Sequence, residues 1–282
     1  MKNITIIIYI FLGFWMMPVS LFSAQIDMDT TSTKIVEGEE FLVSFFIDSQ
    51  NEKINALEGK LSYSQDILEI IDIRSGNSVI NFWLEDLKNT KGKSDTFSGI
   101  IPGGYQGEKG FIFSVLYRAK AQGNATIAIV NGKGLRNDEN GTEIKTTSKL
   151  RTFTVSKNSS AVAPTILMMK EDISPENFTV YRGQSQDIFD GNYFIVFATQ
   201  DKGSGVDHYE VKEGFFGKYV EAKSPYLLKN QKRTSTLYIK ALDKDGNERI
   251  EKLSAEIRPW YTSYWFLILL FLVSVVLSKR YI

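Results

Sequence analysis

The sequence predicts an all-β protein of two sandwich domains, with a transmembrane helix at its C-terminal end. Three observations carry this prediction. Short runs of alternating apolar and polar residues fill the middle of the chain, a small and polar segment divides them into two sets, and continuous apolar segments lie near both ends. Alternation with a period of two indicates strands with one buried face, and regularly spaced turn residues are typical of β-sandwiches.

Residues 1–24 have the pattern of a secretory signal peptide. Lys2 precedes an apolar run over residues 4–22, and the run is followed by the small residues Ser23 and Ala24. We therefore expect export and cleavage after Ala24. Because Phe22 is bulkier than the small residue usual at its position, retention as an uncleaved anchor is the alternative.

Residues 25–156 form the first predicted domain, a β-sandwich. Its clearest alternation runs from Leu57 to Tyr63 and directs three side chains to the outward face: Glu58, Lys60 and Ser62. The β-rich runs that predict further strands are 41–47, 68–73, 111–117, 126–130 and 150–155. Only the stretch 78–87 has a hint of helical spacing.

Residues 157–164 are small and polar and end in proline, which is typical of a short linker between domains. A second domain follows over residues 165–258. Its predicted strands are 178–181, 193–198, 208–211, 235–241 and 249–253. So many strands in about 90 residues fit an immunoglobulin-like sandwich.

Residues 260–278 carry no charge and are mostly apolar. Nineteen helical residues would span about 28 Å, close to the thickness of a bilayer core. Aromatic residues gather at the start of this segment, and Lys279 and Arg280 follow it. The positive-inside rule then places the tail 279–282 in the cytoplasm. We expect a single-pass protein of the cell membrane with an extracellular ectodomain.

Composition excludes several functions. Removing Lys2, Lys279 and Arg280 from the 33 basic residues leaves 30 against 33 acidic ones, a net charge of −3 that does not favour nucleic acid. The chain has no cysteine and a single histidine, His208, in a strand-like context. Thiol catalysis, cysteine metal sites and multi-histidine sites are therefore excluded, and we predict that the protein is not an enzyme.

The first domain resembles the cohesin domains, which bind dockerins in cellulosome-type assemblies. The resemblance covers residues 26–156 and rests on the order of several motifs: VEGE at 36–39, INALEGKLSYSQDILEII at 54–71, GEKGFIFSV at 107–115 and AKAQGNATI at 119–127. It implies a nine-stranded jelly-roll sandwich that binds a protein partner.

The sequence departs from the family on the strand that carries the predicted binding face. The family usually has Asp-Pro where this chain has Ser64-Gln65, and dockerin-binding cohesins commonly carry Asn and Asp where it has Ala56 and Glu58. Buried polar contacts discriminate steeply when one partner is missing. We therefore expect a protein partner, dockerin-like or other, on Glu58, Lys60 and Ser62, with a plain solvated face as the alternative.

The second domain is similar to bacterial immunoglobulin-like repeats, which generally serve as spacers or adhesive modules. The segment DKGSGV at 201–206 is followed by YEV at 209–211, and SPY at 224–226 and ALDKDGN at 241–247 match turns of those repeats. The resemblance implies a stalk between the first domain and the membrane.

No cofactor or metal is predicted. In the segment 243–247 (DKDGN), Gly246 is the fourth residue, whereas an EF-hand loop needs glycine at the sixth. A hairpin turn is therefore favoured there over a calcium loop, and the same applies to 137–141 (NDENG). Neighbouring carboxylates on a strand point to opposite faces and do not form a glycosidase pair.

Two aromatic residues indicate an alternative function, the binding of carbohydrate. Trp83 and Tyr105 could form a flat platform for a sugar, with core packing as the competing interpretation of Trp83. We thus predict a non-catalytic, membrane-anchored surface receptor or adhesin that binds a protein through its cohesin-like head. A polysaccharide-binding module and a purely structural envelope protein are the alternatives.

Overall fold

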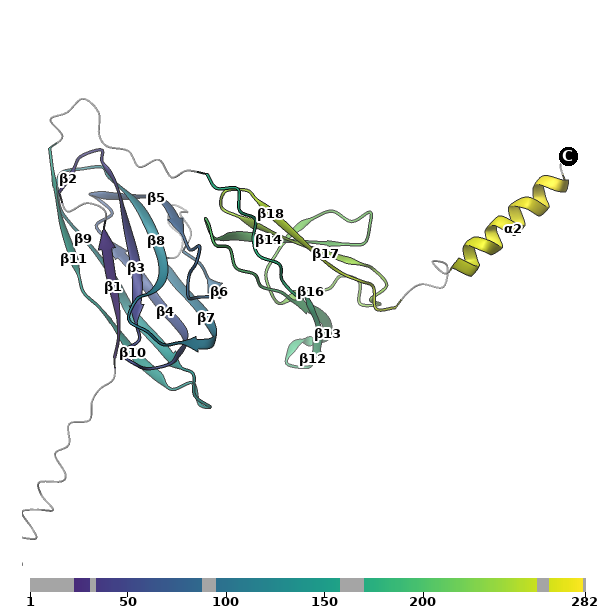
Figure 1. Cartoon of the computed structure of the whole chain (residues 1–282), viewed down its shortest axis with the longest axis horizontal. Coiled ribbons are helices and arrows are strands. Elements are labelled where there is room, and N and C mark those ends of the chain that lie inside the picture. Colours follow the sequence, from purple (N-terminus) through teal and green to yellow (C-terminus); the bar gives the residue numbers. More distant parts are fainter. Residues whose placement is uncertain (1–22, 31–33, 88–94, 158–169, 258–263, 281–282) are drawn as a thin grey trace, which may run out of the picture.

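The computed structural model describes residues 23–30, 34–87, 95–157, 170–257 and 264–280, in which two all-β bodies are followed by a helix (Figure 1). Most of the predicted signal peptide and of the predicted linker lies outside these residues. The predicted cleavage boundary falls inside the first strand, β1 (Ala24–Thr30), where Ala24 is fully buried.

The first body contains eleven strands within the described residues, where nine were expected. The strands that follow β1 are β2 (Ile35–Val36), β3 (Glu40–Asp48), β4 (Ile54–Tyr63), β5 (Leu68–Arg74), β6 (Phe82–Glu85), β7 (Thr96–Tyr105), β8 (Gly110–Ala119), β9 (Gly123–Arg136), β10 (Glu143–Ser148) and β11 (Arg151–Ser156). The additional strands include the two-residue β2, which pairs with β11. Residues 78–87, which hinted at a helix, contain β6.

These strands form two layers of one continuous sheet, in the order β5-β8-β3-β1-β10-β9-β4-β7-β6. The sheet passes from one layer to the other where β1 pairs in parallel with β10, Ala24 opposite Thr146. Other pairings along the path are antiparallel. The all-β sandwich predicted from the alternation is therefore confirmed.

Aromatic rings join the two layers of this sandwich. Phe113 on β8 lies 4.8 Å from the ring of Phe45 on β3 and 5.2 Å from the ring of Phe97 on β7, centroid to centroid. All three side chains are buried. The inward positions of β3, β4 and β8 hold alternating apolar residues because successive side chains of a strand point to opposite faces.

The second body is also all-β and has two antiparallel sheets on one apolar core. One sheet has the order β12-β13-β16 and the other β15-β14-β17-β18. The strands are β12 (Tyr181–Ser185), β13 (Ile188–Val196), β14 (Val206–Glu213), β15 (Val220–Ala222), β16 (Tyr226–Leu227), β17 (Leu237–Asp243) and β18 (Glu248–Leu253). The strand expected at 178–181 begins only at Tyr181.

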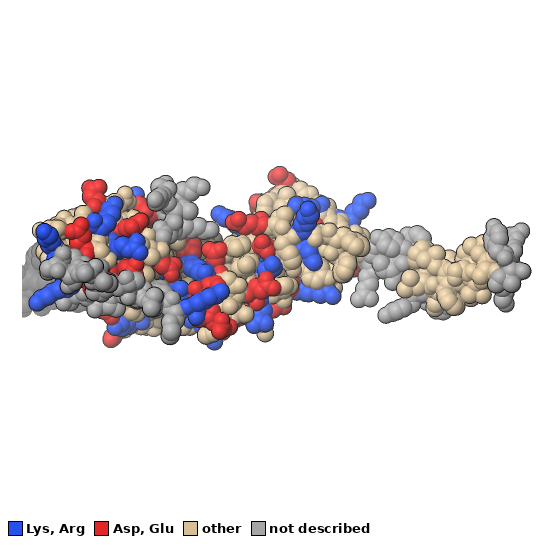
Figure 2. All heavy atoms as spheres, turned by 90° about the horizontal axis from the view of Figure 1, so that it is seen from above, with Lys and Arg blue, Asp and Glu red and all other residues tan. Residues whose placement is uncertain are grey.

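Helix α2 (Tyr264–Arg280) has 17 residues and exposes consecutive apolar side chains, from Leu267 to Val273. Figure 2 shows no charged side chain on its described part. None of the helices in the described ranges has both the length and the apolar character needed to cross a membrane. The predicted transmembrane helix over 260–278 is therefore not supported, and its first four residues lie outside the described ranges.

The two bodies are docked through polar contacts between loops. Arg74 at the end of β5 donates two hydrogen bonds to the Asp245 carboxylate, with distances of 3.1 and 3.2 Å. Lys244 donates to the Ile73 carbonyl at 2.8 Å. The Asn77 amide donates to the Asp201 carbonyl at 3.1 Å. These contacts fix the end of the second body that carries the β13–β14 loop and the β17–β18 turn.

Candidate functional site

Strand β4 presents the three side chains that the sequence assigned to a binding face. Glu58, Lys60 and Ser62 are exposed, whereas the neighbouring Leu57 and Leu61 on the same strand are each 1 % exposed. The exposures hold with the second body in place, so it does not cover these residues. The predicted orientation of this strand is therefore correct, because period-two alternation alone determines it.

The same face carries a row of apolar side chains across four strands, which the sequence pattern does not indicate. Ala56 on β4 is opposite Leu135 on β9 and opposite Ile100 on β7, and Ile100 is opposite Phe82 on β6. Directly opposite residues of paired strands point to the same side of the sheet. Leu135 and Ile100 are each nearly 40 % exposed.

A polar row runs beside the apolar one. Glu58 is opposite Lys133 on β9 and Ser98 on β7, and Ser98 is opposite Glu85 on β6. The Lys133 ammonium lies 3.7 Å from the Glu58 carboxylate. Lys60 lies two residues further along β4, on the same side of the sheet as Glu58. We call the face formed by these two rows and by Lys60 the open sheet face.

The second body borders the open sheet face at the β6–β7 edge without closing it. A shallow groove there is lined by Phe82, Ile100 and Pro102 from the first body and by Asn177 and Phe178 from the second. Charges of both signs are interspersed over both bodies in the view of Figure 2. The surface visible in this view therefore has no large patch of one charge that would favour a strongly charged partner of the opposite sign.

Trp83 and Tyr105, the predicted carbohydrate platform, are both half-buried and packed against the first core. The Tyr105 ring lies over Gly107 and Gly110, whose Cβ positions would be 2.6 Å from its atoms. Trp83 lines a cavity of about 350 Å³ between the two bodies, together with His208 and Tyr209. This geometry favours packing roles for the two rings.

His208 lies in β14, as its sequence context predicted, and its Nδ1 is 2.5 Å from the Asp207 carboxylate. The predicted hairpin turn at 243–247 is also present, because the Gly246 amide donates to the Asp243 carbonyl at 3.2 Å. At the other turn, hydrogen bonds from Thr142 lower the pKa of the Asp138 carboxyl.

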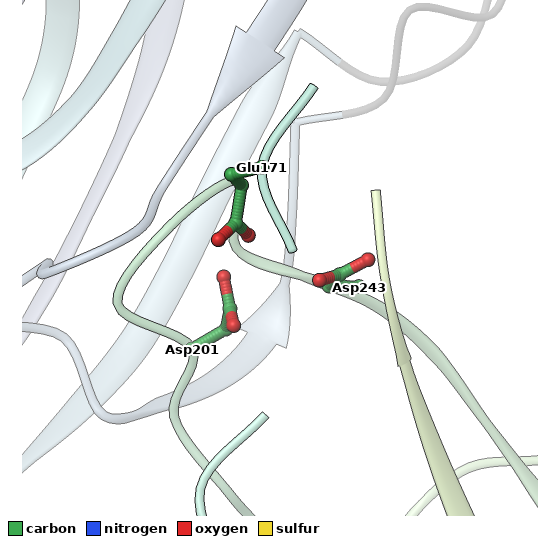
Figure 3. Close-up of side chains that lie close together, drawn as sticks. All are labelled: Glu171, Asp201 and Asp243. Atoms are coloured by element: carbon green, nitrogen blue, oxygen red, sulfur yellow. The ribbon is translucent and has the colours of Figure 1, made fainter. Parts of the chain in front are cut away.

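Three carboxylates that are distant in sequence meet beside the domain junction (Figure 3). Glu171, Asp201 and Asp243 each offer an oxygen, and the three oxygens lie within 4.8 Å of one another. Burial raises the pKa of the Asp201 carboxyl, and the carboxylates of Glu171 and Asp243 add to this rise, whereas the amides of Gly205 and Gly203 oppose it. We call these three residues the junction carboxylates.

No local pattern in the sequence predicts this cluster. Taken alone, segment 243–247 is typical of a hairpin turn, and residues 201–206 match only a motif of the immunoglobulin-like repeats. The available signal was an aspartate at the start of each of two turns, Asp201 and Asp243. Nothing in the sequence indicated that the two turns and Glu171 would meet.

No protein-family model matches the sequence, and no curated protein matches it. Solved structures similar to this chain are cohesin modules. The third ScaB cohesin of R. flavefaciens, in complex with a group 1 dockerin, is 16 % identical, with a TM-score of 0.40 and coverage of 49 % of this chain and 99 % of that one.

Two further cohesins show similar values. A cohesin module from a Clostridium perfringens family 33 glycoside hydrolase is 8 % identical, with 49 % and 99 % coverage and a TM-score of 0.38. A non-cellulosomal cohesin from Archaeoglobus fulgidus is 22 % identical, with 47 % and 91 % coverage and a TM-score of 0.37. The expected resemblance to cohesin modules is thus found over about half of the chain.

Proposed function

We propose that the first domain is a non-catalytic module that binds a protein partner on the open sheet face. The observation that carries this proposal is the uninterrupted apolar row Leu135–Ala56–Ile100–Phe82, which is accessible and lies beside a row of charged residues. An apolar centre with a polar rim is the usual anatomy of a protein–protein interface.

The open sheet face is a preformed surface. Apart from β6 at the sheet edge, its strands are paired on both sides, as β4 is between β9 and β7, so the positions of their side chains are fixed before a partner arrives. Preorganisation reduces the conformational entropy lost on binding. A partner that matches this surface would present an apolar stripe and flanking charges opposite to Lys60 and Glu58.

A dockerin-like module is the first partner to test, because the sequence of the first domain resembles the cohesins. The position where dockerin-binding cohesins commonly carry Asn is occupied by Ala56, in the middle of the apolar row. Glu58, at the position of the usual Asp, lies beside Lys133. We therefore expect a partner whose contact at this point is apolar.

Two substitutions on the face test the proposal. Leu135→Lys places a charge in the apolar row, and Lys60→Glu reverses a charge beside it. We expect each to weaken partner binding about tenfold or more, which corresponds to about 1.4 kcal/mol. The full-length chain and its variants would be compared in pull-downs from the secreted proteins of the source cells and by surface plasmon resonance against purified dockerin modules.

Matched controls carry the same substitutions elsewhere on the surface. Leu150→Lys changes another exposed leucine between β10 and β11, and Lys120→Glu reverses an exposed charge in the β8–β9 turn. Both should capture the partner as the wild type does. If Leu135→Lys and Leu150→Lys bind equally well, the open sheet face is not the binding site.

We also propose that the chain is exported and held at the cell membrane, with the residues before Arg258 outside. The uncharged segment 260–278 followed by Lys279 and Arg280, and the consecutive exposed apolar side chains of α2, support this. We expect the chain in the membrane fraction after alkaline carbonate extraction and expect added protease to cleave it on intact cells. Release of the chain by carbonate would contradict this location.

A further inference from the structure

We propose that the junction carboxylates bind one calcium ion, and that this ion fixes the second domain against the first. The site would be formed by Glu171, Asp201 and Asp243, which the fold brings together from three separate segments (Figure 3). The three residues belong to the second body and not to the open sheet face, so the inference does not depend on the partner proposed for that face.

The negative charge of the junction carboxylates is not compensated by any ion pair among the described residues. Asp201 is 4 % exposed and Asp243 is 3 % exposed, with Glu171 half-buried beside them. The lysines adjacent to the two aspartates in sequence pair with other residues: Lys202 with Glu176 and Lys244 with Asp86. Buried carboxylates are normally paired with a cation or coordinated to a metal.

One carboxylate oxygen of the cluster has no partner among the described residues. The Oδ2 atom of Asp201 accepts hydrogen bonds from the amides of Gly203 and Gly205, at 2.9 and 2.7 Å. Its Oδ1 atom is buried and has no hydrogen-bond partner among the described residues. Figure 3 shows the Asp201 carboxylate pointing toward that of Glu171. The amides hold the carboxylate in place and leave Oδ1 available for a ligand.

The donor set indicates which ion would bind. All three groups are carboxylates, and hard oxygen ligands select Ca²⁺ or Mg²⁺ over softer metals. At a Ca–O distance of about 2.4 Å, two ligand oxygens can be up to about 4.8 Å apart, whereas around Mg²⁺ the limit is about 4.2 Å. The three oxygens lie within 4.8 Å of one another, so a single calcium ion could contact all of them.

The position of the cluster links the ion to the domain junction. The loop that follows Asp201 contacts the first domain directly, because Asn77 donates its amide to the Asp201 carbonyl and its side chain to the Lys202 carbonyl, at 3.1 and 2.8 Å. In the turn that follows Asp243, Asp245 accepts from Arg74. An ion bridging Asp201, Asp243 and Glu171 would tie both docking loops to the start of the second domain.

The binding test uses calcium alone with the full-length chain, after treatment with EDTA. We expect isothermal titration calorimetry to give one Ca²⁺ per chain, and Asp201→Asn and Asp243→Asn to weaken binding at least about tenfold by removing a ligand charge. Asp207→Asn is the matched control, because Asp207 is an exposed carboxylate in the neighbouring strand β14. It should leave calcium affinity unchanged.

A thermal melt separates ligand binding from a purely structural role of Asp201. The wild-type melting temperature should rise with calcium, since a ligand that binds only the folded state stabilises it. Asp201→Asn should not respond to calcium, and in EDTA it should be as stable as the wild type or more stable, because one of three clustered charges is removed. Equal destabilisation with and without calcium would indicate a structural role and overturn the proposal.

Hydrogen exchange tests the effect on the junction. Calcium should slow exchange of the Asn77 and Gly205 amides in the wild type and leave them unchanged in Asp201→Asn. The proposal is overturned if the wild type binds no Ca²⁺ at about 10 mM, above the range of the weakest extracellular sites. It is also overturned if Mg²⁺ binds more tightly than Ca²⁺, or if both carboxylate variants bind calcium as the wild type does.

Discussion

Replacing Phe113 by alanine is expected to lower the free energy of unfolding of the first domain by about 3–5 kcal/mol. The side chain is 1 % exposed and its ring contacts Phe45 in its own layer and Phe97 in the other. Truncation would remove buried apolar area and leave a cavity between two rings whose backbones are fixed by strand pairing. The surrounding sheets can close such a cavity only in part.

Urea denaturation of the full-length chain, followed by hydrogen exchange in β3 and β8, would measure this loss in the first domain alone. Phe216→Ala is the control, because Phe216 is 96 % exposed in the loop between β14 and β15. Its effect should stay within about 0.5 kcal/mol. A loss below about 1 kcal/mol for Phe113→Ala would show that the ring does not join the layers as described.

Replacing Gly76 by alanine is expected to separate the two domains at their junction. A Cβ atom at this position would lie 1.8 Å from the carbonyl oxygen of Gly203 and 2.5 Å from its carbonyl carbon. These are backbone atoms of the docked loop, so no side chain can rotate away. The φ angle of Gly76 is outside the left-handed region, and the clash with the second domain is therefore the main effect.

The expected result is faster hydrogen exchange at the Asn77 amide, by about tenfold or more, because its acceptor is the Asp201 carbonyl across the junction. Gly134→Ala in β9 is the matched control, since its Cβ would meet side-chain atoms at ordinary distances of 3.4–3.6 Å. Both variants should keep the amide protection of the two sandwich cores. Unchanged exchange at Asn77 in Gly76→Ala would mean that the junction is not closed in solution.

These two substitutions act on different levels of the structure. Phe113→Ala weakens a core whose apolar positions follow the alternation along single strands. Gly76→Ala affects a contact between loops about 130 residues apart in sequence, for which no local pattern exists. A junction that depends on close backbone contact, on the pairing of Arg74 with Asp245 and on the proposed calcium ion would hold the open sheet face at a defined angle to the second domain.

Local patterns accounted for much of the fold. Strands β3, β5, β8, β11 and β18 lie within two residues of the ranges expected for them. Strand β12 was displaced, because the alternation over 178–181 belongs to a segment that packs against the second core without sheet pairing in its first residues. The additional strands of the first domain include β2, whose two residues are too few for a periodic signal, and β10, whose residues are mostly polar.

The sequence by itself determined which side of β4 faces outward, because side chains alternate with a fixed period whatever the partner strands are. It also determined the turn at Gly246 and the absence of thiol and multi-histidine chemistry. Only the tertiary structure decided that Ala56 lies in an apolar row, that Trp83 lines the junction and that Glu171, Asp201 and Asp243 meet. Those features depend on strand register and on docking between segments that are distant in sequence. Contacts of this kind are non-local, so no pattern along a single segment indicates them.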